Sequence, residues 1–337
     1  MKKTILVIVV LSLLFFGVRY YMSFFGSNMN IEKSVSLYIP SQANWQQLMD
    51  SMQHNNFLKN EASFVRVAEK MGLKNNIHPG RYIIEKGMSN YALAKKIRSG
   101  KQDPIKLVLN KLRTKKDIIQ KLSSKLEPSA QDFSALFSSA DWLQKMGIDS
   151  NQVQCVIIPN TYEVYWNTDA EHVLEKITKS YFQYWNDERK NKAKALQLTP
   201  MQVCTIASIV EEETNKNDEK PKIASVYLNR YKIGMKLGAD PTVKFAVGDF
   251  ALKRILTKHT QTPSPYNTYL VQGLPPGPIC TPNKSSIEAV LNPDQTNYLF
   301  FCAKEDFSGY HNFAENYSQH QANAKRYHQA LNERNIK

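Results

Sequence analysis

The chain has 337 residues, of which 44 are Lys or Arg and 30 are Asp or Glu, so its formal net charge is +14. With 42% hydrophobic and 22% charged residues, the composition is that of a globular protein and excludes a mostly disordered or collagen-like chain. The length suggests about two domains. The four cysteines form no CxxC pair and the seven histidines show no metal-ligand spacing, so we expect no metal and no other cofactor.

The N-terminus has the pattern of a membrane anchor. Lys2 and Lys3 precede an apolar run that is interrupted at Arg19 and resumes up to Phe25. The segment from Thr4 to Phe25 is long enough to span ~30 Å of hydrocarbon at 1.5 Å per residue. It is not followed by a small-x-small cleavage site, which favours an uncleaved anchor over a signal peptide. We therefore expect a single-pass protein of the cell (inner) membrane, with a cytoplasmic N-terminus, an extracytoplasmic (periplasmic) main part and no nucleic-acid partner.

Behind this segment, one plan of strand, turn and amphipathic helix occurs three times. The predicted strands are residues 35–39, 80–84 and 105–109. The residues predicted to cap the following helices are Asn44, Ser89 and Thr114. Another helix, or a pair, is expected over residues 57–73. Together these elements predict a small α+β module over roughly residues 30–110.

The remainder of the chain is predicted to be a larger mixed α+β region. In chain order we expect helices with loops over residues 127–148, a short buried strand at 156–159, a long helix over 170–195, two helices between 199 and 231, loops beyond 234 with short strands such as 298–302, and a last helix over 317–332.

The first helix after Thr199 carries the residues with the clearest chemical meaning. Thr199 and Pro200 are a strong helix start. On a helical wheel Glu212 points toward water, whereas Glu211 and Glu213 lie at the two edges of the apolar arc. A carboxyl that enters a half-buried pocket there has a raised pKa and can serve as a general acid. The alternative is that the acidic triplet is a solvated helix end.

The surrounding motifs decide between these interpretations. In chain order they are Pro159-Asn160-Thr161-Tyr162, then residues 207–214 (ASIVEEET), 223–230 (IASVYLNR), 234–243 (GMKLGADPTV), 266–269 (YNTY) and 273–279 (GLPPGPI). This set, in this order, resembles the endolytic murein transglycosylase (YceG-like) family. The resemblance covers nearly the whole chain, although Asn160 stands where the family has Asp. It implies an anchor at 1–28, a LysM-like module at 29–110 and a transglycosylase catalytic domain at 111–337.

The resemblance also implies a reaction. Glu211 matches the family's catalytic acid/base, which would cleave the bond between N-acetylmuramic acid and N-acetylglucosamine in nascent glycan strands and leave 1,6-anhydro ends. The resemblance implies that the protein's partners are peptidoglycan glycan strands and peptidoglycan synthases, and that the protein terminates strand elongation. The residues expected to bind substrate are Ser208, Glu213, Asn229, Asp240, Thr242, Tyr266, Asn267, Thr268 and Tyr269.

Several of these residues also have a local structural interpretation. The polar groups of 240–242 and 266–269 could bind sugar hydroxyls, or they could only cap turns, and the two readings stand about even. For His311 a structural role is favoured, while Arg230 is as compatible with an ion pair as with a ligand. Two other functions stay open: a hydrolytic muramidase with a second carboxylate such as Glu213 or Asp240, and a non-catalytic cell-wall scaffold.

Overall fold

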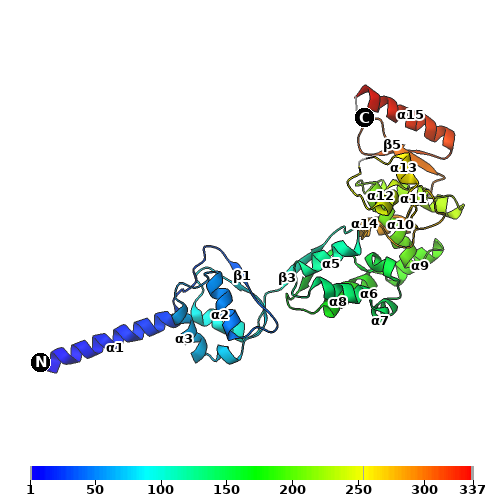
Figure 1. The fold of residues 1–337 in the computed structure, drawn as a ribbon. Helices are drawn as coiled ribbons and strands as arrows, with labels where there is room; N and C mark the ends of the chain where they lie inside the picture. The colour runs from blue at the N-terminus through cyan, green and yellow to red at the C-terminus, as the bar shows by residue number, and fades with distance from the viewer. Residues whose placement is uncertain (1, 253, 335–337) are drawn as a thin grey trace. The chain divides into compact units, whose positions relative to one another are not determined.

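The computed structural model describes residues 2–252 and 254–334 (Figure 1). Met1 of the predicted anchor and residues 335–337 of the predicted catalytic domain lie outside the described residues. The chain divides into two compact units. The N-terminal unit contains residues 2–107, 125–129 and 163–169, and the C-terminal unit contains 108–124, 130–162 and 170–334. The predicted anchor thus belongs to the same compact unit as the module that follows it.

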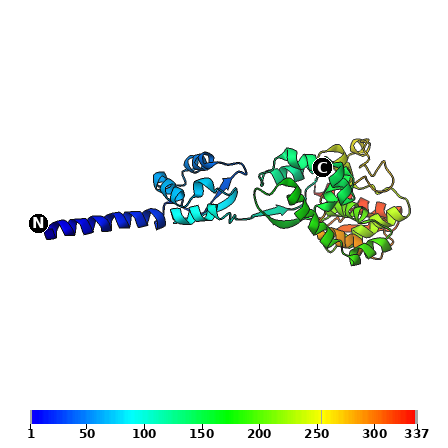
Figure 2. The ribbon, with the colours of Figure 1, turned by 90° about the horizontal axis from the view of Figure 1, so that it is seen from below.

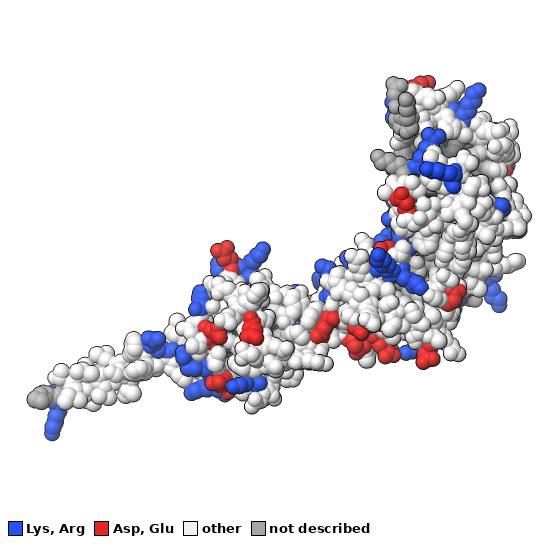
Figure 3. Space-filling view, in the orientation of Figure 1, with Lys and Arg blue, Asp and Glu red and all other residues white. Residues whose placement is uncertain are grey.

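Helix α1 (Lys2–Phe25) is the predicted anchor segment and is one continuous helix (Figures 1 and 2). The side chains of residues 2–22 are all exposed, although most of them are apolar. In Figure 3 this helix has a largely uncharged surface, with blue at its start. It is long and apolar enough to cross a membrane. An apolar helix without protein around it is what a lipid-facing segment requires.

The rest of the N-terminal unit is a small α+β module. Strands β1 (Val35–Ile39) and β2 (Gly80–Ile84) pair antiparallel, with Leu37 opposite Tyr82. Alternate residues of both strands are buried against the helices α2 (Trp45–His54), α3 (Glu61–Lys70) and α4 (Asn90–Arg98) and the 3₁₀ helix η1 (Leu73–Asn75). The strands and the caps Asn44 and Ser89 are as predicted.

A cluster of polar side chains joins the end of α1 to this module. The amide of Asn90 donates to the carbonyl oxygen of Ser23 at 2.9 Å and to Ser63 Oγ at 3.0 Å. Asn28 Nδ2 donates to Asn90 Oδ1 at 2.7 Å. Because a buried amide is costly without partners, these bonds hold the last turn of α1 against α3 and α4.

The first part of the C-terminal unit is mainly helical. Its elements are α5 (Lys115–Ser123), α6 (Ala130–Ser138), α7 (Ala140–Met146), the 3₁₀ helix η2 (Ser150–Val156), α8 (Ala170–Tyr184) and α9 (Asp187–Ala195). Strands β3 (Ile105–Leu109) and β4 (Asn160–Val164), each of which has residues in both units, form a two-stranded sheet.

Two predictions in this region were wrong. The long helix expected over 170–195 is interrupted, because Asn186 accepts a hydrogen bond from the backbone of Arg189 at 3.0 Å and so begins α9 as a separate helix. Of the residues expected to form a strand at 156–159, Val156 is the last residue of η2 and 157–159 lie in no helix or strand; the strand itself begins at Asn160.

The second part of the C-terminal unit contains the predicted chemical residues. Helices α10 (Pro200–Glu213), α11 (Lys220–Lys232), α12 (Asp240–Val247) and α14 (Lys284–Leu291) pack around buried apolar side chains. The short helix α13 (Thr257–Thr260) lies in the connection after α12. Strands β5 (Phe300–Ala303) and β6 (His311–Ala314) form an antiparallel hairpin that packs on α15 (Tyr317–Glu333). Helices α12 and α14 were expected to be loops.

Candidate active site

Helix α10 presents three consecutive glutamates in its last turn. Its start is fixed by a capping box, in which Thr199 Oγ1 accepts from the Gln202 backbone at 3.2 Å and the Gln202 side chain accepts from the Thr199 backbone at 2.8 Å. Residues 203–210 are buried, and their packing fixes the rotation of α10 about its own axis. Successive residues are about 100° apart, and the three glutamates therefore face three different surroundings.

Glu211 lies inside the helix packing and is 7% exposed. Its Oε2 is 3.1 Å from Lys220 Nζ on α11 and accepts a 2.5 Å hydrogen bond from Ser286 Oγ on α14. Its Oε1 accepts a 2.6 Å bond from Asn283 Nδ2, just ahead of α14. Both oxygens are therefore engaged with protein groups, and this carboxylate joins three helices.

Glu212 was expected to face water, and the structure corrects this. Its carboxylate lies 3.2 Å from Lys111 Nζ and 3.0 Å from Arg113 Nη2, and its side chain is only 14% exposed. The three residues form a partly buried ion cluster. It borders a small cavity of about 40 Å³ that Lys244 also lines.

Glu213 opens onto a cleft. Its carboxylate accepts a hydrogen bond from the hydroxyl of Tyr227 on α11. Burial raises the pKa of Glu213 from 4.5 to about 7, and the nearby negative charge of Asp240 adds to this rise. The Tyr227 hydrogen bond and the positive charges of Arg230 and Lys244 act in the opposite direction. A carboxyl with a pKa near 7 is present in both forms at neutral pH, as a general acid/base requires.

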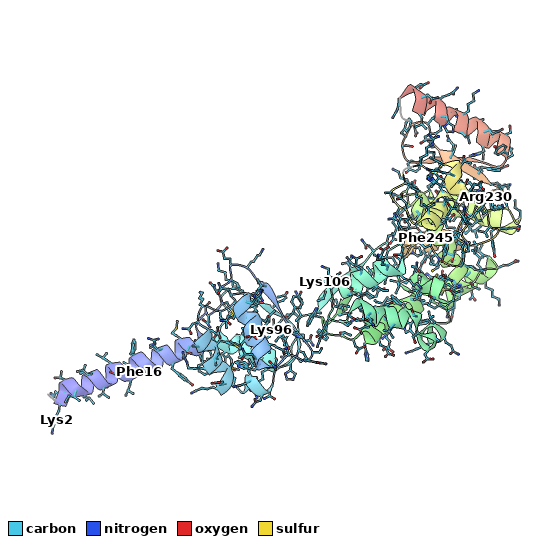
Figure 4. The ribbon with its side chains drawn as sticks, in the orientation of Figure 1. Lys2, Phe16, Lys96, Lys106, Arg230 and Phe245 are labelled. Atoms are coloured by element: carbon cyan, nitrogen blue, oxygen red, sulfur yellow. The ribbon has the colours of Figure 1, made fainter. Side chains whose placement is uncertain are left out.

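The cleft has a volume of about 500 Å³, which is large enough for sugar residues. Its walls combine hydrogen-bonding groups with aromatic and apolar surface. The lining residues are Glu213, Tyr227, Arg230, Met235, Lys236, Gly238, Asp240, Tyr269, Phe301, Cys302, Ala303, His311 and His320. Arg230 on α11 is labelled in Figure 4.

Three of the predicted residues meet in this cleft: Glu213, Asp240 and Tyr269. The Tyr269 hydroxyl donates to Asp240 Oδ1 at 2.7 Å, so the loop that follows Asn267 is tied to the start of α12. Tyr269 is 38% exposed. Its ring and the Asp240 carboxylate are accessible to a ligand in the cleft.

Four other predicted binding residues have no exposed surface, which differs from the prediction of direct substrate contact. These are Ser208, Thr242, Asn267 and Thr268. Ser208 Oγ accepts from the backbone of Ile279 at 3.0 Å, and the hydroxyls of Thr242 and Thr268 are 2.8 Å apart. Asn267 Nδ2 donates to the backbone oxygens of Thr260 and Thr262. In this structure their polar groups hold the loops of the site together.

Two further predicted residues lie outside the cleft wall. Asn229 Nδ2 donates to the carbonyl oxygens of Thr296 at 2.9 Å and Tyr298 at 3.0 Å, and so ties α11 to the segment before β5. Tyr266 packs its ring on Phe245 of α12, which Figure 4 labels, with 4.6 Å between ring centroids. Neither is among the described residues that line the cleft.

Sequence reasoning underrated two residues of the site. Tyr227 is part of the quoted motif IASVYLNR, but no role was predicted for it; the structure places it among the buried residues of α11. His311 lines the cleft, with Nδ1 at 2.8 Å from Glu219 Oε2 and its backbone N–H donating to Glu219 Oε1 at 2.7 Å. The pairing with Glu219 is the structural role that was expected, and the position in the cleft was not.

Comparison with known proteins places this site in a family. The model of the YceG-like family matches residues 37–326. The chain belongs to this family. Membership confirms the resemblance that the motifs indicated, and the match runs from β1 to α15.

Two curated relatives of the YceG-like chain carry the same name. The endolytic murein transglycosylase of Bacillus subtilis (strain 168) is 29% identical over 322 residues, which cover 89% of this chain and 87% of that protein. The endolytic murein transglycosylase of Streptococcus pneumoniae (strain D39) is 25% identical over 344 residues, covering 92% of this chain but 61% of that protein.

A solved structure shares the fold. The crystal structure of a YceG-like protein from Listeria monocytogenes superposes with a TM-score of 0.59 at 23% identity. The superposition covers 87% of this chain and 99% of the other. The α+β architecture described above is therefore that of the YceG-like family.

Proposed function

We propose that this YceG-like protein is a membrane-anchored endolytic murein transglycosylase with Glu213 as its catalytic acid/base. Its substrate would be nascent peptidoglycan, and the bond it cleaves would join N-acetylmuramic acid to N-acetylglucosamine. The observation that carries the proposal is the Glu213 carboxyl, which opens onto the cleft with a pKa raised to about 7. The shared name of the curated relatives supports the substrate class.

The proposed reaction needs one proton shuttle. Glu213 in its acid form donates its proton to the glycosidic oxygen while the bond from that oxygen to C1 of the muramic acid breaks. The resulting carboxylate then removes the proton of the C6 hydroxyl of the same sugar, and O6 bonds to C1. The product has a 1,6-anhydro end, the acid is regenerated and no water is consumed. Because the substrate supplies its own nucleophile, the second carboxylate of ordinary glycoside hydrolysis is not required.

The sequence motifs suggested Glu211 as the catalytic residue, whereas the geometry favours Glu213. Both oxygens of Glu211 are bonded to protein groups, one of them to a buried ammonium. A carboxylate with both oxygens engaged by protein groups is not free to contact a glycosidic oxygen. Glu213 has one protein hydrogen bond among the described residues and faces the cleft. We therefore infer that Glu211 has a structural role in the site.

We also propose that this protein acts at the cell membrane. Helix α1 would hold the protein in the cell membrane, with Lys2 and Lys3 on the cytoplasmic side and both compact units outside. Cleavage close to the membrane would act on strands as they are made and terminate their elongation. Peptidoglycan synthases are then the expected protein partners.

The test compares two carboxylates on one substrate. The full-length protein in detergent is incubated with purified peptidoglycan strands, and the products are analysed by mass spectrometry. We expect anhydro ends from wild type, none from Glu213→Gln, and retained cleavage by Glu212→Gln, a matched change one residue away. Glu211→Gln should lower stability yet leave the chemistry in the fraction that stays folded.

Three results would contradict the proposal. Reducing ends as the only product would identify a hydrolase, because these ends are one water heavier. Cleavage by Glu213→Gln together with complete loss in a folded Glu211→Gln protein would return the catalytic role to Glu211. Complementation of a deletion strain by Glu213→Gln would support a scaffold instead of an enzyme.

A further inference from the structure

The hydroxyl of Tyr227 is buried and directed at the proposed catalytic carboxyl. Tyr227 lies on α11, is 1% exposed and donates its hydroxyl to Glu213 Oε1. Its ring stands at 89° to the ring of Phe301 on β5, with 5.9 Å between centroids. A buried tyrosine held by its ring and its hydroxyl has little freedom. It therefore gives the Glu213 side chain a fixed partner from a neighbouring helix.

Two other polar groups near Glu213, those of Arg230 and Asp240, are engaged elsewhere. The Arg230 guanidinium donates to the backbone oxygens of Leu237 and Leu299. Asp240 accepts the hydroxyl of Tyr269. Among the described residues, Tyr227 is the one side chain with a hydrogen bond to the Glu213 carboxyl. The orientation of this carboxyl thus depends on a single donor.

We propose that Tyr227 is a positioning residue that assigns different tasks to the two oxygens of Glu213. A protonated carboxyl has one O–H oxygen and one carbonyl oxygen, and the carbonyl oxygen is the better acceptor. Because Tyr227 donates to Oε1, the proton of the acid form resides on Oε2. Oε2 is then the oxygen that gives the proton to the glycosidic bond and takes one back from the C6 hydroxyl. This inference rests on the proposed function.

The hydrogen bond also sets the pH range of activity. A donor stabilises the carboxylate more than the acid, so the bond lowers the pKa of Glu213 against the effect of burial. Activity needs the acid form in the free enzyme, so it falls as pH rises through that pKa. Without the hydroxyl the fall moves to higher pH. The titratable and charged groups that act on Glu213 or line its cleft, and that stay unchanged in the variant, are Arg230, Lys236, Asp240, Lys244, Tyr269, Cys302, His311 and His320.

The experiment measures kcat/KM for strand cleavage against pH with the full-length protein in detergent. For Tyr227→Phe we expect the alkaline fall to move up by roughly one pH unit, since hydrogen bonds to charged groups are of that size. We also expect the plateau to drop by roughly tenfold, because the carboxyl is less well oriented. The matched control is Tyr231→Phe on the same helix, whose hydroxyl accepts from Gln202 Nε2 at 3.4 Å. This control should keep the wild-type profile.

A second variant reverses the sign and keeps the shape of the side chain. Site-specific 3-fluorotyrosine at position 227 has a more acidic phenol and donates a stronger hydrogen bond, so the alkaline fall should move to lower pH. This variant carries the test if Tyr227→Phe does not fold. An unmoved profile in a folded, active variant would overturn the role of Tyr227 alone. Absence of cleavage by the wild type would overturn the proposed function as well.

Discussion

The ionisation of Glu213 links the chemistry of the site to the stability of the fold. Its pKa is raised from 4.5 to about 7 in the folded protein, chiefly by burial. The folded state therefore holds this proton at pH values where the unfolded state has released it. The contribution of the neutral acid to stability is complete below about 4.5 and is lost as pH rises through about 7. Raising the pH through about 7 therefore weakens the fold at the residue that we propose as the catalytic acid.

This link predicts that Glu213→Gln becomes more stable relative to wild type as pH rises, because glutamine stays neutral. Relative to wild type, the variant should gain stability between pH 4.5 and pH 8 by at most about 3 kcal/mol. Urea unfolding of both proteins at the two pH values measures the difference. Glu171→Gln, at an exposed position on α8, is the control and should show no such gain. Equal differences at both pH values would contradict the raised pKa.

The sequence predicted part of this arrangement. The helical wheel placed Glu211 and Glu213 at the edges of the apolar arc, and both are at least partly buried. It did not show which of them faces the cleft, because that depends on groups far along the chain. Lys220, Asn283 and Ser286 surround Glu211, and only the packing of α11 and α14 brings them there.

At the scale of elements, the buried pair of Glu211 and Lys220 holds α10 against α11. Lys220 is 3% exposed, and its ammonium also donates to Ser285 Oγ at 3.2 Å. A buried pair adds little net stability over an apolar replacement, but removal of one partner leaves an uncompensated charge. The pair thus acts chiefly to specify how these helices meet.

We therefore predict that Lys220→Met destabilises the protein by about 3–5 kcal/mol. The double variant Glu211→Gln/Lys220→Met should recover much of that loss, since neither charge is left alone. Chemical denaturation of the wild type, the two single variants and the double variant measures the coupling between the two charges. Lys232→Met, at an exposed position on the same helix, should cost little. Additive losses in the double variant would show that the pair is not coupled.

The elements themselves were predictable where local signals are strong. The strands of the N-terminal unit and the caps Asn44, Ser89 and Thr114 follow from alternation and from side chains that accept backbone hydrogen bonds. Helices α12 and α14 were missed because each has only eight residues. Asp240-Pro241, which starts α12, is also a common turn sequence, and the helix depends on tertiary contacts for its stability.

At the scale of the whole molecule, the junction at the end of α1 bears on function. The 24 residues of α1 extend about 36 Å, enough to cross a bilayer with some tilt. Asn90 fastens the last turn directly to the module. With α1 in a membrane, the module would be held at the membrane surface without a flexible spacer.

The proposed membrane anchor predicts a simple fractionation result. Val9→Arg/Leu13→Arg places two charges near the middle of α1, where each costs about 2.5–3.5 kcal/mol. The variant should be lost from the membrane pellet after alkaline carbonate extraction, whereas wild type and the apolar control Val9→Leu/Leu13→Val should remain in it. Retention of the arginine variant in the pellet would contradict a spanning helix.

The acidic triplet at the end of α10 has an evolutionary consequence. Three adjacent residues have three different roles: Glu211 links helices through a buried ion pair, Glu212 pairs with two cations, and Glu213 is the proposed proton donor. A single residue inserted just ahead of them would turn each side chain by about 100° about the helix axis, into the position that the next residue occupies now. Insertions and deletions should therefore be far less tolerated in this turn than in the loops beyond it, even when the insertion preserves the composition.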